Sequence, residues 1–207
     1  MGLETPRILV LGIGNLLWAD EGFGVRCAEV LDAEWIFPSN VTVMDGGTQG
    51  LYLLPHLEDL DLLIVFDAVD YGLEPGTMKI VRDDDVPAFM GAKKMSLHQT
   101  GFQDVLAAAE LTGIKPAHLL LIGVQPEELE DYGGGLRDVV ARQIAPAIDV
   151  ALSDMRVRWG IVTERRAARE HRLSDASISR EAYEGGRPSE EEAYRHGDAR
   201  FLNRARA

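Results

Sequence analysis

The 207-residue sequence has 46% hydrophobic and 27% charged residues, ordinary proportions for a folded globular protein. Its one cysteine, Cys27, excludes an intrachain disulfide framework and a multi-cysteine zinc site. The formal net charge of −13 argues against a nucleic-acid partner, because binding to phosphate backbones depends on Lys and Arg. No apolar run approaches the ~18 residues that cross a bilayer, and no basic segment precedes the first apolar run. We therefore expect a cytoplasmic protein that has no membrane partner.

Charge and composition change near residue 155. Residues 156–207 hold 12 Arg and 9 acidic residues, which leaves a net charge of −16 for residues 1–155. The later segment has no Lys and few aliphatic residues, so it buries too little apolar surface to offset the entropy of ordering. We predict a compact α/β domain over 1–155 and a polar, Arg-rich C-terminal tail over 156–207, disordered or loosely helical.

Strands and helices alternate along the predicted domain. Unbroken apolar runs predict strands buried on both faces, and apolar residues at intervals of three and four predict amphipathic helices. In chain order the expected elements are a strand over 8–13, a helix over 23–31, strands over 41–44, 62–66 and 78–81, a helix over 102–109, a strand over 119–124 and a helix over 140–151. This alternation is typical of a three-layer α/β fold, in which an open, largely parallel or mixed sheet has helices on both faces.

Ligands of such sheets bind beyond the carboxyl ends of the strands, so polar residues that follow strands are candidate site residues. Asp20 and Glu21 close the loop after the first strand, and Asp45 ends the second. Asp67 ends the third strand, and His98 lies just before a later helix. We expect these side chains to converge on one edge of the sheet.

Each candidate also has a structural explanation. An acid at position 21 is favoured by the helix dipole, and Asp20 suits a helix N-cap. His98 could cap or pack against a helix. Asp67 is the stronger functional candidate, because it follows five apolar residues at a position where burying a charge is costly.

Taken together, Glu21, Asp67 and His98 supply two carboxylates and one imidazole. Such a set suits an open site for Ni, Zn or Fe with positions free for water or substrate. The sequence separations are long, so only the fold could bring the three together. The segment Asp45-Gly46-Gly47-Thr48 has two interpretations: a tight turn with Thr48 as an N-cap, or a backbone that approaches a substrate closely.

Two other chemistries fit the sequence poorly. The run from Gly12 to Leu17 resembles a dinucleotide-binding fingerprint, but Leu17 stands where that fingerprint needs a small residue. No Gly-x-Ser-x-Gly elbow of a serine hydrolase is present. Cys27 lies on the apolar stripe of the first helix, which favours a core residue over a nucleophile.

The combination of motifs over residues 7–152 resembles the maturation endopeptidases of [NiFe] hydrogenases, and most closely those that serve uptake hydrogenases. The matching segments are Gly12-Ile13-Gly14-Asn15-Leu16-Leu17, Asp20-Glu21-Gly22, Gly24-Val25-Arg26, Asp45-Gly46-Gly47-Thr48, Asp67-Ala68, Pro75-Gly76-Thr77, Ser96-Leu97-His98-Gln99 and Gly123-Val124-Gln125-Pro126. The resemblance implies an α/β endopeptidase that removes a C-terminal extension from the hydrogenase large-subunit precursor after nickel insertion.

The resemblance also implies site roles. It assigns metal binding to Glu21, Asp67 and His98, and it associates the segment from Asp45 to Thr48 with recognition or catalysis. The working hypothesis is that nickel held by the precursor gains contacts from the three metal-binding residues, and that a carboxylate, with Asp45 the first to test, acts as the base for water attack. A non-catalytic nickel-sensing chaperone of the same precursor is the alternative, and a nucleotide-dependent enzyme is a weaker one.

Overall fold

The chain forms a five-stranded sheet between two layers of helices. The computed structural model describes residues 5–90, 97–167, 173 and 180–185, with the backbone alone at 88–90, 97–101, 181 and 184. The strands are β1 (Ile8–Ile13), β3 (Val41–Gly47), β4 (Leu62–Ala68), β5 (Met78–Arg82) and β6 (His118–Val124). They are ordered β3-β1-β4-β6-β5 across the sheet. The predicted fold class is confirmed.

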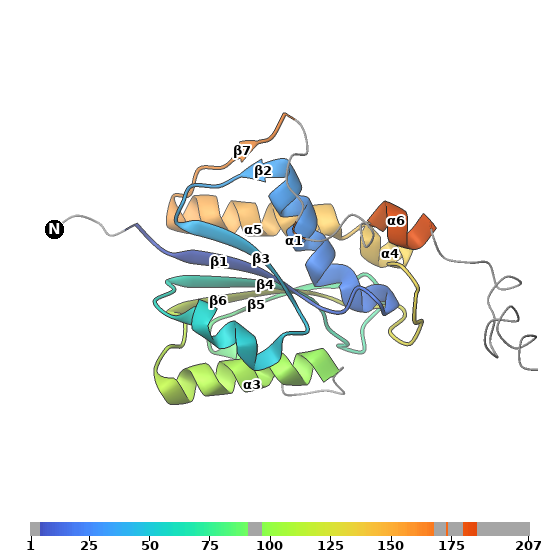
Figure 1. Ribbon diagram of the computed structural model, residues 1–207, viewed down its shortest axis with the longest axis horizontal. Helices are drawn as coiled ribbons and strands as arrows, with labels where there is room; N and C mark the ends of the chain where they lie inside the picture. Colours follow the sequence, from blue (N-terminus) through green and yellow to red (C-terminus); the bar gives the residue numbers. More distant parts are fainter. Residues whose placement is uncertain (1–4, 91–96, 168–172, 174–179, 186–207) are drawn as a thin grey trace, which may run out of the picture.

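Four of these strands are parallel, so their carboxyl ends meet at one edge. β1 pairs in parallel with β3 and β4, and β4 pairs in parallel with β6. The remaining strand, β5, pairs antiparallel with β6 at the margin of the sheet. In Figure 1 the parallel strands start at the left, near the N-terminus, and point to the right.

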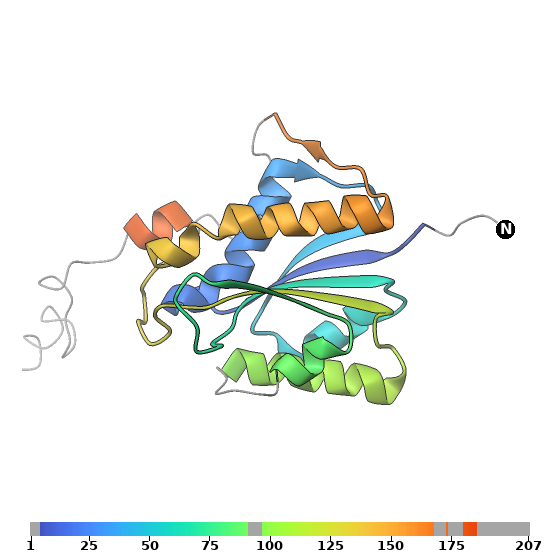
Figure 2. The ribbon, with the colours of Figure 1, turned by 180° about the vertical axis from the view of Figure 1, so that it is seen from behind.

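Helices cover both faces of the sheet. One face carries α1 (Phe23–Glu34), α4 (Asp138–Ala141) and α5 (Ile144–Trp159), and the other carries η2 (Gly50–Leu57), α2 (Asp85–Met90) and α3 (Leu97–Thr112) (Figures 1 and 2). Alternate β1 residues belong to separate cores: Ile8 and Val10 pack toward α1 and α5, whereas Leu9 and Leu11 pack toward η2 and α3. This double burial explains why the three central strands β1, β4 and β6 are largely apolar on both faces, whereas the outer strands β3 and β5 include polar residues.

Two glycines let α1 lie directly on the carboxyl ends of β1 and β4. A Cβ added to Gly12 would collide with the carbonyl oxygen of Gly24, and a Cβ added to Gly24 would collide with the carbonyl oxygens of Phe66 and Ile13. The N-terminal end of α1 therefore lies against the carboxyl ends of β1 and β4, at the edge of the sheet where ligands are expected.

The packed domain extends beyond the boundary predicted at residue 155, which falls inside α5. This helix continues to Trp159 and ends at Gly160, whose φ of 67° suits a glycine C-cap. Ile161 is buried in the core beside α1 and α5. β7 (Glu164–Arg165) then pairs antiparallel with β2 (Trp35–Ile36). The composition of 156–207 did not indicate these contacts, because only a few residues of an otherwise polar segment make them.

Beyond β7 the structure describes α6 (Arg180–Gly185), which lies near α4 in Figures 1 and 2. Most of the predicted tail lies outside the described residues, so its expected disorder remains a prediction. Within the described part of the chain, every helix is too short or too polar to cross a membrane.

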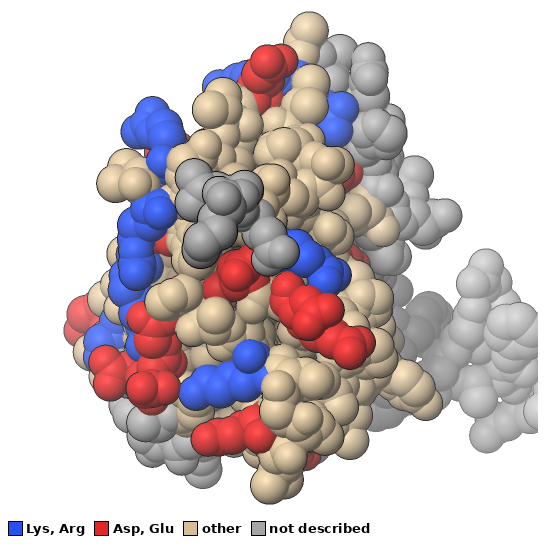
Figure 3. All heavy atoms as spheres, turned by 90° about the vertical axis from the view of Figure 1, so that its left-hand side faces the viewer, with Lys and Arg blue, Asp and Glu red and all other residues tan. Residues whose placement is uncertain are grey.

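The end of the molecule opposite the carboxyl edge shows charges of both signs side by side (Figure 3). Several pair with one another there, including Arg7 with Asp59 at 3.5 Å and Arg82 with Asp154 at 2.7 Å. The Arg7 pair is typical of a solvated surface, whereas the Asp154 side chain is only 3% exposed.

Candidate active site

The first loop, between β1 and α1, forms the middle of the carboxyl edge. It contains η1 (Ala19–Gly22), which carries Glu21 and contacts β4. The backbone N–H of Asn15 donates to the carbonyl of Glu21 at 3.2 Å, and the N–H of Gly14 donates to the carbonyl of Gly47 at 3.1 Å. A Cβ on Gly14 would collide with the Glu21 carbonyl, so this glycine allows the loop to fold back tightly. The half-buried side chain of Glu21 therefore starts from a fixed backbone.

Asp20 is fully buried and joins the first loop to the loop after β6. Its carboxylate accepts hydrogen bonds from the backbone N–H groups of Glu127 at 2.8 Å, Glu128 at 2.9 Å and Arg137 at 2.7 Å. It makes no side-chain cap to η1 or α1, so the N-cap interpretation is wrong. Sequence reasoning missed this role because backbone N–H donors leave no side-chain signal.

Asp67 is the second-to-last residue of β4, and its side chain is fully buried. In the strand register Asp67 lies opposite Gly123 of β6. The Tyr71 hydroxyl occupies the space that a Cβ on Gly123 would fill. Burial, together with the nearby charge of Asp67, raises the pKa of Tyr71, which keeps this phenol neutral. The Nζ of Lys79 lies 5.5 Å from the centre of the Tyr71 ring. Tyr71 and Lys79 were not predicted, although Tyr71 lies in the loop directly after the strand that carries Asp67.

Gln125 fixes the loop that contains Tyr71. Its side-chain oxygen accepts from the backbone N–H of Tyr71 at 2.7 Å and of Leu73 at 3.1 Å, and its side-chain nitrogen donates to Asp70 at 3.0 Å. The buried amide thus uses both ends to hold one loop. Through Gln125, the motif Gly123-Val124-Gln125-Pro126 therefore fixes the loop that follows β4.

Asp45 lies near the end of β3, where its Oδ1 accepts from the backbone N–H of Gly47 at 2.8 Å. Burial raises the pKa of the Asp45 carboxyl, and the Gly47 N–H lowers it; the charge of Glu29 raises it and that of Arg26 lowers it. The net result is a pKa above the ordinary value for Asp. Arg26 is only 4% exposed and pairs with Glu29 at 2.8 Å.

The turn after Asp45 agrees in part with the first of its two predicted interpretations, a tight turn with Thr48 as an N-cap. Gly47 has a φ of 44°, in the left-handed region that glycine adopts easily. Gly46 packs beneath against Leu11, where a Cβ would come within 2.7 Å of the Leu11 side chain. Thr48 is exposed and does not cap η2, whose N-cap is Gln49. The predicted N-cap role of Thr48 is therefore wrong.

The structure brings the elements that carry Glu21 and Asp67 into contact, whereas the side chain of His98 lies outside the described residues. His98 itself is in the first turn of α3, one residue after the helix begins. In Figure 1 that end of α3 lies toward the carboxyl edge. Among the described side chains, no group of three or more His, Cys, Asp or Glu is placed to hold a metal ion. The predicted three-residue metal site thus remains a prediction.

Cys27 is buried in the core, and burial raises the pKa of its thiol well above the ordinary value. A thiol held neutral is a poor nucleophile, which fits the predicted core role.

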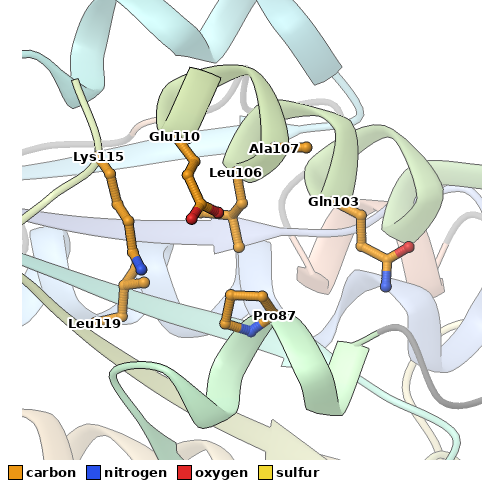
Figure 4. A pocket seen from close by; sticks show the side chains of 7 residues that line it. All are labelled: Pro87, Gln103, Leu106, Ala107, Glu110, Lys115 and Leu119. Atoms are coloured by element: carbon orange, nitrogen blue, oxygen red, sulfur yellow. The ribbon is translucent and has the colours of Figure 1, made fainter. Parts of the chain in front are cut away.

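A hollow of about 300 Å³ lies between α2 and α3, away from the carboxyl edge (Figure 4). Its lining combines apolar side chains such as Leu106 and Leu119 with Glu110 and Lys115 at the margin. A single carboxylate beside a single amine gives no acid-base pair comparable to the carboxyl edge, so we assign the chemistry to that edge.

Comparison with known proteins identifies the family of the chain. A family model described as hydrogenase maturation protease matches residues 25–154. The hydrogenase expression/formation protein HoxM of Azotobacter vinelandii is 62% identical over 200 residues, which cover 97% of this chain and 96% of that protein. HupD of Rhodobacter capsulatus, of the same description, is 62% identical over 199 residues, covering 96% of this chain and 94% of that protein.

Among solved structures, the hydrogenase maturating endopeptidase HybD from Escherichia coli shares the fold, with a TM-score of 0.73 and 44% identity. The match covers 78% of this chain and 98% of that chain. The family match and this structural likeness together define a peptidase of the α/β class. More specifically, the chain belongs to the hydrogenase maturation protease family. The resemblance found in the sequence is confirmed.

Proposed function

We propose that this peptidase removes the C-terminal extension of a [NiFe] hydrogenase large-subunit precursor after nickel insertion, and that it recognises nickel held by the precursor. One observation carries the proposal: Glu21 and Asp67 stand on contacting elements at the carboxyl edge of a chain of this family. Carboxylate oxygens, with the imidazole of His98 in the first turn of α3, are suitable ligands for a divalent first-row metal.

Nickel enters this scheme as part of the substrate. Glu21 is half-buried at the edge, and Asp67 lies below it in β4, so the two carboxylates differ in access to solvent. Additional ligands from the enzyme would orient the precursor backbone around its nickel. Such orientation can contribute roughly 7–11 kcal/mol to lowering a barrier. A precursor without nickel would lack these contacts, which would account for the proposed order of metal insertion and cleavage.

We propose Asp45 as the general base. The peptidase would then depend on a carboxylate and be of the aspartic type. Its oxygen would take a proton from water as the water oxygen bonds to the scissile carbonyl carbon. The carbon–nitrogen bond then breaks, and the amine of the released extension takes up a proton. Burial supports this role, because the raised pKa of Asp45 makes its carboxylate a stronger base. The backbone of Gly46, Gly47 and Thr48 is proposed to contact the substrate strand beside it.

The test is the mass of a purified large-subunit precursor before and after incubation, with and without nickel. We expect shortening of the nickel-loaded precursor only. Glu21→Ala, Asp67→Ala and His98→Ala should each abolish it while circular dichroism shows an intact fold. Full processing by all three variants, or equal processing without nickel, would overturn the nickel-recognition proposal. Tight binding of the precursor without any change of mass would instead indicate the non-catalytic chaperone.

A further inference from the structure

Of the segment that follows α5, one described piece contacts the C-terminal end of α1, and another contacts the loop that precedes α1. At the C-terminal end, Arg166 donates its backbone N–H to the carbonyl of Glu34 at 2.7 Å and its Nε to the carbonyl of Asp32 at 3.1 Å. Arg165 pairs with the Glu34 carboxylate at 2.9 Å. These bonds satisfy carbonyl groups that a helix end leaves without partners, so the segment is anchored there.

The second piece reaches the first loop, at the N-terminal end of α1. The hydroxyl of Tyr183, in α6, donates to the carbonyl of Leu17 at 3.4 Å. Leu17 lies a few residues before η1, which carries Glu21. We call the two described pieces, residues 160–167 and 180–185, the C-terminal arm. Its α6 end therefore lies beside the loop that contributes to the candidate active site.

The arm meets an aromatic surface at this point. The rings of Trp18 and Tyr132 are edge to face with centroids 5.1 Å apart, and the N–H of Gly133 donates to the Leu17 carbonyl at 2.8 Å. Leu17 is 40% exposed and Tyr132 is 64% exposed. We call Leu17, Trp18, Tyr132 and Tyr183 the aromatic rim.

The loops beneath the rim are rigidly joined. The Asp20 carboxylate binds backbone N–H groups on both sides of Tyr132, at Glu128 and Arg137. Aromatic side chains on a fixed backbone make strong contacts with a protein partner, because little conformational freedom is lost on binding. The rim continues directly into the active site, since the N–H of Glu21 donates to the Trp18 carbonyl at 2.9 Å.

The lengths of the relatives separate the arm from the core of the peptidase. The E. coli HybD structure is matched over 98% of its length by 78% of this chain, so more than a fifth of this chain has no counterpart there. That fraction is close in length to the segment after α5. HoxM of Azotobacter vinelandii, in contrast, matches 97% of this chain. The peptidase fold is thus complete without a segment of this length.

We propose that the C-terminal arm and the aromatic rim form a docking surface for the substrate protein, which places an apolar segment on Leu17 and Tyr132 while its cleavage site lies at the carboxyl edge. The inference rests on the proposed function, because it takes the substrate to be the precursor protein. A substrate of the proposed peptidase would lie at the carboxyl edge, and the rim is an exposed apolar surface of the described chain beside that edge. The arm therefore contributes to affinity and partner choice, and the chemistry remains with the carboxylates.

The experiment compares the full chain with a chain that ends at Ala167, which keeps β7 and its anchor but lacks α6. Initial rates of precursor shortening give kcat and KM, and biolayer interferometry gives the affinity for the precursor. We expect KM and the dissociation constant to rise about tenfold or more in the shortened chain, with kcat within about twofold. Tyr132→Ala and Tyr183→Ala should show the same pattern with smaller increases. Leu111→Ala, an 89% exposed apolar residue at the far end of α3, is the matched control.

Unchanged KM and affinity in the shortened chain, or a loss of kcat at unchanged KM, would overturn the docking role. Should the shortened chain unfold, the two tyrosine variants decide the matter by the same criteria. The binding measurement separates this proposal from the proposed function. If the full chain binds the precursor but leaves its mass unchanged, the peptidase assignment to that substrate fails, whereas tenfold weaker binding by the shortened chain still supports the docking surface.

Discussion

The carboxylate of Asp20 accepts a 2.7 Å hydrogen bond from the backbone N–H of Arg137, 117 residues further along the chain. With the two further N–H donors of Glu127 and Glu128, it fastens the loop after β6 to the first loop. Hydrogen bonds to a charged group are stronger than neutral ones, and all three donors would lose their partner together. Asp20 therefore supports the site by holding the two loops together.

Asp20→Ala should lower the free energy of unfolding by about 3 kcal/mol or more, because buried N–H groups lose a charged acceptor. Urea denaturation monitored by tryptophan fluorescence measures this. Glu127→Ala is the control: it keeps the backbone N–H and removes only an exposed side chain, so we expect a change within about 0.5 kcal/mol. Equal destabilisation by both variants would contradict the role of the Asp20 carboxylate.

Gly24→Ala should destabilise the protein by about 1–3 kcal/mol, because the added methyl group has no room between α1 and the ends of β1 and β4. Gly185→Ala is the matched control, since a Cβ there meets no atom within 4 Å. Thermal unfolding of both variants provides the comparison. A Gly24→Ala protein as stable as the control would show that the helix can move away from the sheet at little cost.

The sheet could be predicted from the sequence because its strands are apolar on both faces, as in residues 8–13 and 62–66. The carboxyl-edge rule also placed Glu21 and Asp67 on neighbouring elements. The bonds of Asp20 could not be predicted, since their donors are backbone groups far along the chain. The pairing of the buried Arg26 with the partly buried Glu29 was not predicted, because charged residues within a helix usually face solvent.

The boundary at residue 155 was placed too early for a related reason. Ile161 and the β7 pairing fix a short stretch whose composition is polar. A composition average over the tail cannot show a single buried side chain or two paired residues.

The acid side of the pH-rate profile should report the ionisation of Asp45 if it is the base. Only the carboxylate accepts a proton, so kcat/KM falls as the pH drops through the pKa of Asp45, which burial raises. Arg26→Gln removes a charge that lowers this pKa and should move the fall in kcat/KM to higher pH; Glu29→Gln removes a charge that raises it and should move the fall to lower pH. Profiles that coincide in both variants would argue for a different base.

Asp83 should make the stability of the fold depend on pH in the acid range. Burial raises the pKa of its carboxyl, but the hydrogen bonds from the Leu119 N–H and from His118, with the charges of His118 and Arg158, bring the pKa below the ordinary value. A lowered pKa gives stability that is present above pH ~4 and is lost as the pH falls through the folded pKa. The carboxyl is 44% exposed, so the effect should stay below about 1 kcal/mol.

Asp83→Asn removes this titration. The difference in unfolding free energy between pH 6 and pH 3, measured by urea denaturation, should therefore be smaller in the variant than in the parent chain. A larger difference in the variant would show that the folded-state pKa of Asp83 is not lowered.

Direct contact between the enzyme carboxylates and the substrate's nickel can be measured by X-ray absorption at the nickel edge. An Asp45→Asn chain, expected to bind without cleaving, would be mixed with nickel-loaded precursor, with and without additional Glu21→Ala or Asp67→Ala substitutions. We predict that complex formation adds oxygen or nitrogen ligands to nickel and that each additional substitution removes part of this change. A nickel spectrum identical in the free precursor and in a demonstrated complex would contradict recognition of the metal by these two carboxylates.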